Sequence, residues 1–179
     1  MIICTDRRPK FTDGYVMSEQ ERHDIEHALD HYEDSRAASI DALKIVQKKH
    51  GWVPDSAIYA IADIIKIPAA DVDGVATFYN KIFRKPVGRN VIMVCDSIGC
   101  FLTGYEDLIA EIKQQLNIDY GQTTPDNRFT LLPICCLGNC DKGPTLMINE
   151  DTHGPVSIEQ VSSLLEQYQW QWFLPIHGH

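Results

Sequence analysis

The 179-residue sequence has no long apolar run. Its most apolar stretch, residues 58–72, is interrupted by Asp63, Lys66 and Asp71, so it stays below the roughly 18–20 residues that a bilayer-spanning helix needs. The N-terminus also lacks an apolar segment long enough for a signal peptide. These absences argue against a membrane-spanning or secreted protein, and we expect the chain to stay in the cytoplasm, where it is made.

Positive charge is also in short supply. Lysine and arginine together number 16, against 25 aspartates and glutamates, which gives a formal net charge of −9. Proteins that bind nucleic acids neutralise phosphates with these basic side chains. Residues 68–79 could be taken for the recognition helix of a DNA-binding domain, but they include two aspartates and no lysine or arginine. We therefore expect no nucleic-acid partner.

Three short motifs are missing as well. No G-x-G-x-x-G follows an apparent strand and no P-loop occurs, so nothing predicts a site for NADH or a flavin on this chain. The spacing C-x-x-C is absent too, which argues against a thioredoxin-type dithiol. Any redox chemistry of the cysteines must therefore use another arrangement.

The first part of the chain has the pattern of a helical bundle. Residues 1–17 are mixed and polar, and we expect them to form a flexible arm. Ser18 and Glu21 make a capping box, which predicts the start of a helix. Further helices are expected over about 36–50, after Pro54 and after Pro68, the last with Val72 and Tyr79 on its inner side. We predict a small four-helix bundle over residues 18–85.

The pattern changes after a linker at residues 84–90. Short apolar strands are expected at 91–94, 129–134 and 145–148, and amphipathic helices over 105–116 and from Ser157 to Tyr168. The order β-α-β-β-α predicts a second domain over residues 86–170, followed by a C-terminal tail at 171–179. The predicted fold class is therefore α/β, with a small helical bundle before the α/β domain.

Five of the six cysteines lie in two loops that follow predicted strands. Cys95 and Cys100 form C-x4-C; the second loop can be read as C-x4-C from Cys135 or as C-x3-C from Cys136, both ending at Cys140. In a reducing cytoplasm, clustered cysteines bind metal more often than they form disulfides. Four thiolates from two loops suit an iron–sulfur cluster, with structural zinc as an alternative.

The cysteine segments 95–100 and 136–144 resemble the thioredoxin-like [2Fe–2S] subunit family of respiratory complex I, the bacterial NADH:quinone oxidoreductase. Residues 47–54 and 76–79 in the helical part are similar to the same family, and the resemblance runs from about residue 18 to 168. It implies a thioredoxin-like second domain.

The resemblance also implies the ligands. The family pattern is C-x4-C followed by C-x3-C, which makes Cys95, Cys100, Cys136 and Cys140 the ligands of one [2Fe–2S] cluster. Cys135 then becomes a neighbour of the site and not a ligand.

The resemblance implies that the chain transfers electrons. It would do so in the NADH dehydrogenase module of respiratory complex I, which is an oxidoreductase and a translocase. Its partners would be an FMN- and NADH-binding subunit and further subunits of the peripheral arm. The chain itself would lie on the cytoplasmic side of the inner membrane and would be attached to the membrane only through the complex. The small subunit of an NAD-linked hydrogenase or formate dehydrogenase would carry similar motifs. A zinc-bound interaction module is the alternative from a different class.

Overall fold

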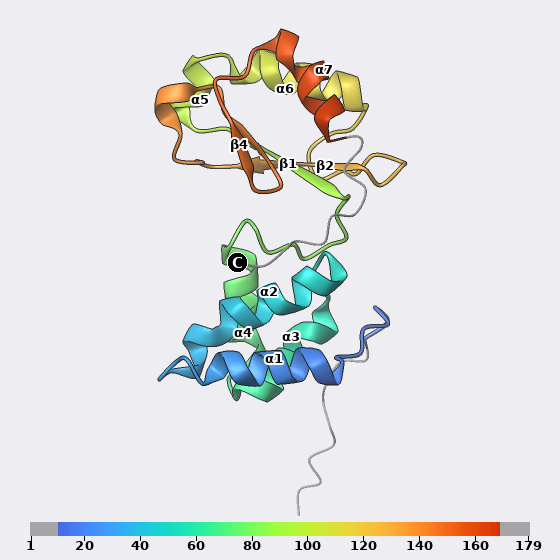
Figure 1. Ribbon diagram of the computed structural model, residues 1–179, viewed down its shortest axis with the longest axis vertical. Helices are drawn as coiled ribbons and strands as arrows, with labels where there is room; N and C mark the ends of the chain where they lie inside the picture. The colour runs from blue at the N-terminus through green and yellow to red at the C-terminus, as the bar shows by residue number, and fades with distance from the viewer. Residues whose placement is uncertain (1–10, 169–179) are drawn as a thin grey trace, which may run out of the picture. The chain divides into compact units, whose positions relative to one another are not determined.

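A computed structural model describes residues 11–168 (Figure 1). The chain divides between Pro86 and Val87 into two compact units, a helical unit and a sheet unit. The tail expected at 171–179 and the first ten residues of the expected arm lie outside the described residues. Among the helices described, none has both the length and the apolar character to cross a bilayer.

The described part of the helical unit, residues 11–86, holds four α-helices and one short 3-10 helix, η1. Helix α1 begins after Ser18, whose side chain and that of Glu21 form the expected capping box. The inward faces of all four helices meet in one core, which includes Ile25, Leu43 and Ile61, each fully buried. The bounds are α1 Glu19–Leu29, η1 Ser35–Ala38, α2 Ser39–His50, α3 Asp55–Ile65 and α4 Ala69–Phe78.

Helix α4 ends one residue earlier than its apolar pattern predicts. Phe78 is its last residue, and Tyr79 has an extended backbone. Helical spacing therefore no longer carries Tyr79 to the face of Val72, and its side chain is 48% exposed. The placement of Tyr79 on the inner side of this helix is wrong.

The described part of the expected arm packs against the helical unit. The Phe11 ring lies 5.0 Å from the Tyr59 ring, centroid to centroid. The Asp13 carboxylate accepts hydrogen bonds from the Ser56 backbone N–H at 3.0 Å and from the Ser56 hydroxyl at 2.7 Å. Phe11 and Asp13 thus have partners on α3.

The sheet unit contains a four-stranded sheet in the order β2-β1-β3-β4. Strand β1 is parallel to β2 and antiparallel to β3, and β3 is antiparallel to β4. The three expected strands are present, and β4 at the edge is an addition to the expected order. The bounds are β1 Asn90–Cys95, β2 Phe129–Ile134, β3 Leu146–Ile148 and β4 Asp151–His153.

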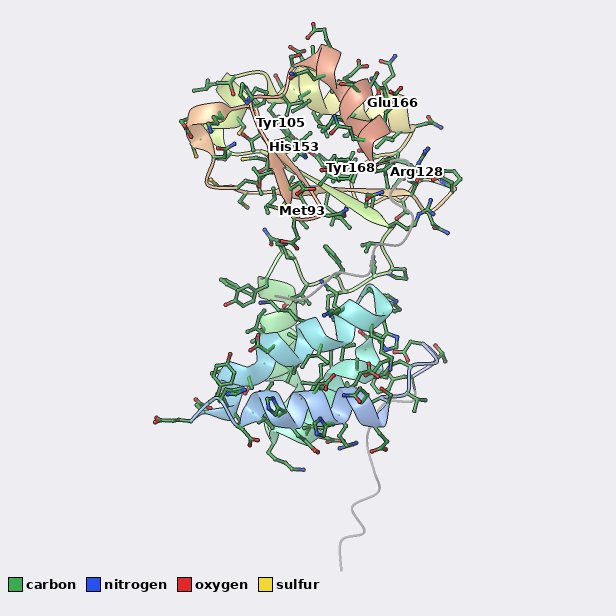
Figure 2. The ribbon with its side chains drawn as sticks, viewed as in Figure 1. Met93, Tyr105, Arg128, His153, Glu166 and Tyr168 are labelled. Atoms are coloured by element: carbon green, nitrogen blue, oxygen red, sulfur yellow. The ribbon has the colours of Figure 1, made fainter. Side chains whose placement is uncertain are left out.

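Helices α6, Tyr105–Leu116, and α7, Ile158–Gln167, lie on the same face of this sheet (Figure 1). Their apolar residues and those of the strands make one core, which includes Leu108, Phe129 and Leu165. Tyr168, directly after α7, closes this core against the edge strand, since its hydroxyl lies 2.9 Å from His153 Nε2 (Figure 2). The mixed helix-and-sheet fold class is confirmed.

Candidate metal centre

The sheet topology brings the two cysteine loops to one edge. Because β1 and β2 are parallel neighbours, their C-terminal ends lie side by side, and Cys95 at the end of β1 pairs with Ile134 at the end of β2. A hydrogen bond of 3.0 Å from the Asp96 N–H to the Ile134 carbonyl extends this pairing by one residue. Both loops therefore start from the same fixed point.

The first loop buries its two thiols. Cys95 is the last residue of β1, and Cys100 lies in a short helix, α5 Ile98–Leu102, that the sequence pattern does not predict. Both side chains are 2% exposed. The Thr103 hydroxyl lies 3.0 Å from the Gly99 carbonyl oxygen and 3.1 Å from that of Cys100, so it holds the end of α5.

The second loop presents its thiols at the surface. The sulfur atoms of Cys136 and Cys140 lie 3.7 Å apart. Gly138, with a φ of +75°, turns the chain between them, and its N–H donates to the Cys136 sulfur at 3.4 Å. An atom at the Cβ position of Gly143 would lie 2.6 Å from the Thr103 hydroxyl, so a larger residue there would have to displace the Thr103 side chain.

Cys135 contributes its backbone to this arrangement. Its carbonyl oxygen lies 3.6 Å from the Cys95 sulfur, and its own side chain is exposed. Cys136, one residue on, is the one whose sulfur meets the thiol of Cys140. Of the two cysteines at which the second motif could begin, the geometry favours Cys136.

The four thiols interact with one another electrostatically. Burial raises the pKa of the Cys100 thiol, and the neighbouring sulfurs of Cys95 and Cys140 raise it further. The hydrogen bond from Gly138 N–H lowers the pKa of Cys136, and that thiol in turn raises the pKa of Cys140. These interactions place Cys100 near Cys95 and Cys140, and Cys136 near Cys140 and Cys95.

The donor set fits a dinuclear cluster. Within residues 11–168, no three His, Cys, Asp or Glu side chains converge as ligands of a single ion. The thiols instead form a buried pair, Cys95 and Cys100, and an exposed pair, Cys136 and Cys140, and Cys95 also lies near Cys136. A spacing of 3.7 Å is close to the edge of a tetrahedron whose metal–sulfur bonds are about 2.3 Å long. A [2Fe–2S] cluster takes four thiolates, two for each iron, so the residues present fit that group.

One residue at the site was missed by sequence reasoning. Thr145 precedes β3, is 1% exposed, and accepts a hydrogen bond from the Cys95 N–H at its carbonyl oxygen. The only signal in the sequence is a polar residue at the start of an expected apolar strand. Such a residue is usually a strand end, and only the structure shows what it contacts.

Comparison with known proteins now defines the class of the chain. The model of the thioredoxin-like [2Fe–2S] ferredoxin family matches residues 25–169, and the chain belongs to that family. It is 63% identical over 157 residues to the E subunit of the NADH-quinone oxidoreductase of Pseudomonas aeruginosa, covering 88% of this chain and 95% of that protein. The E subunit of the Escherichia coli K12 enzyme is 61% identical over 158 residues, with the same coverage.

A solved structure supports the fold. The crystal structure of an NAD+-reducing [NiFe]-hydrogenase in the H2-reduced state matches 80% of this chain, with a TM-score of 0.66 and 22% identity. The match covers 24% of the hydrogenase chain. At this identity the likeness establishes a shared fold and nothing more.

Proposed function

We propose that this chain is the [2Fe–2S] electron-transfer subunit of an NADH:quinone oxidoreductase, with Cys95, Cys100, Cys136 and Cys140 as the cluster ligands. The observation that carries the proposal is the meeting of these four thiols at the shared end of β1 and β2. Relatives more than 60% identical over nearly their whole length are named as the E subunit of that complex. The hydrogenase alternative has only a shared fold in its favour.

A bound [2Fe–2S] cluster supplies one-electron transfer through sulfur-ligated iron. This chain's residues do the rest. The buried pair Cys95 and Cys100 fixes one side of the centre inside the domain, and the exposed pair Cys136 and Cys140 leaves the other side open to a partner. Because NADH gives up two electrons as a hydride, a flavin-bearing partner must divide them before a one-electron carrier can accept them.

The surface beside the centre suits a partner protein. Helix α5 exposes three large apolar side chains next to Cys100, namely Ile98 at 70%, Phe101 at 46% and Leu102 at 75%. Exposed apolar groups of this kind mark docking surfaces. We assign this surface to the FMN- and NADH-binding subunit, because electron transfer requires the centre to lie close to the flavin. We also propose that the chain contacts other subunits of the complex on the cytoplasmic side of the membrane.

The proposal predicts conditional reduction by NADH. Under anaerobic conditions we expect NADH to leave the isolated, oxidised chain unchanged and to reduce it once the flavin-bearing partner is added, followed as loss of visible absorbance. Dithionite, which needs no partner, serves as the control that the centre is reducible. Direct reduction of the isolated chain by NADH, or an oxidised centre in the presence of a competent partner, would contradict the assignment.

A further inference from the structure

Buried threonine Thr145 stands at the junction of the two cysteine loops. Its carbonyl oxygen accepts a hydrogen bond from the Cys95 N–H at 3.1 Å. Its main chain therefore contacts Cys95, the residue from which the first loop starts. A residue in this place can affect the metal centre through the cysteine loops, although its side chain is not a ligand.

The Thr145 side chain faces the second loop. Its hydroxyl donates to the Lys142 carbonyl oxygen at 2.7 Å and lies 3.4 Å from Asn139 Nδ2, which donates to it. Cys140 and Lys142 are the first and last residues of the short helix η2, Cys140–Lys142. Asn139 directly precedes this helix. Through its side chain, Thr145 thus holds the segment that carries the fourth thiol.

A third segment closes over this contact. An atom at the Cβ position of Gly154 would lie 2.5 Å from the Thr145 hydroxyl, 2.5 Å from the Lys142 carbonyl oxygen and 2.8 Å from Asn139 Nδ2. The chain after β4 therefore packs directly on the hydroxyl and excludes water from it. A buried hydroxyl without hydrogen-bond partners would lower the stability of the fold. These contacts therefore hold residues 139–142, Thr145 and Gly154 in one arrangement.

We propose that Thr145 is a positioning residue for the metal centre: it ties the Cys140 segment to the Cys95–Cys100 loop and so sets the relative placement of the two thiol pairs. This inference rests on the proposed function for its redox consequences. Outer contacts of this kind orient metal ligands, and their loss typically costs about 10- to 100-fold in metal affinity.

Substitution of Thr145 tests the inference. Thr145→Val keeps the shape and removes the hydroxyl, so we expect iron release to an added chelator to become about tenfold faster. The midpoint potential should also shift, because a loosened segment changes the position of Cys140 relative to the first cysteine loop. Thr145→Ser retains the hydroxyl and should behave as the unchanged protein.

A matched control exists in the same unit. Thr124 is also buried, and its hydroxyl oxygen accepts from the Arg128 and Phe129 N–H groups and donates to Asp126, away from the cysteines. Thr124→Val should lower stability while leaving iron release and the potential unchanged. Equal effects of the two valine variants, or an unaltered Thr145→Val protein, would overturn the positioning role.

A measurement on the iron-free chain separates this inference from the proposed function. The Lys142 N–H donates to the Asn139 carbonyl at 3.0 Å, in the turn that the Thr145 hydroxyl anchors. We expect faster deuterium uptake over residues 136–142 in Thr145→Val and not in Thr124→Val. Unchanged uptake in Thr145→Val would contradict the positioning role of Thr145. Faster uptake in a chain that never binds iron would support that role and reject the proposed function.

Discussion

Replacement of Cys136 by serine is expected to abolish cluster binding, whereas replacement of Cys135 is expected to leave it intact. The Cys136 sulfur lies 3.7 Å from that of Cys140, while Cys135 offers the site its carbonyl oxygen. A serine hydroxyl is a harder and much less acidic ligand than a thiol, so iron binding should fall by more than the about 10- to 100-fold loss typical of outer contacts. Iron content and visible absorbance after anaerobic purification measure the effect.

The pair of variants acts as its own control. Both serines occupy adjacent, exposed positions of one loop, so their effects on folding should be alike. A difference in iron content therefore reports ligation and not stability. If Cys135→Ser lost the cluster while Cys136→Ser kept it, the second motif would begin at Cys135 and the assignment of ligands would be wrong.

The largest effect expected in the helical unit is at Glu21. Its carboxylate is buried, with one oxygen 2.8 Å from His50 Nε2 and the other accepting from the Ser18 N–H at 2.9 Å and from Lys49 Nζ at 3.0 Å. Burial raises the pKa of Glu21, but the hydrogen bonds from Ser18, Lys49 and His50 outweigh it and lower the pKa to about 2. The carboxylate is thus much more stable ionised than protonated in the folded chain.

The lowered pKa of Glu21 determines in which direction the stability of the helical unit changes with pH. Because the folded pKa lies below the unfolded value of about 4.5, the stabilisation is complete above about pH 5 and is lost as the pH falls towards 2. We expect Glu21→Gln to lower the stability of the helical unit by about 2–3 kcal/mol at pH 7. The variant should also lack the part of the acid sensitivity that Glu21 contributes.

Native-state hydrogen exchange of the α1 and α2 amides, followed from pH 7 down to about pH 2, measures this effect. Glu19→Gln is the control, since Glu19 is exposed in the same first turn of α1 and should change stability by less than about 0.5 kcal/mol. Equal stability of the Glu21→Gln protein and the unchanged protein at pH 7 would show that the hydrogen bonds at Glu21 give no net stabilisation.

Strong local patterns made much of the fold predictable. The capping box at Ser18 located the first helix, and the apolar run of residues 129–134 coincides with β2. The cysteine loops were found because both follow apolar strands, and two parallel strands end at one edge. These features depend on neighbours in the sequence, which is where sequence patterns carry information.

Other features depend on contacts between distant residues. Strand β4 is short, polar and at the sheet edge, so it has no apolar alternation to reveal it. Helix α5 has five residues, too few for a helical period. Asp13 is held by Ser56, 43 residues away, and Thr145 acts through hydrogen bonds to two separate segments, at Cys95 and at Asn139 and Lys142. Composition cannot show such partners.

The central claim is that four thiols of this chain hold one [2Fe–2S] cluster. Its most direct test is the electron paramagnetic resonance spectrum of the anaerobically purified full chain, together with its metal and sulfide content. We predict about two irons and two sulfides for each chain, no signal when oxidised and a signal when reduced by one electron. Stoichiometric zinc in a colourless protein that is silent in both states would contradict the claim.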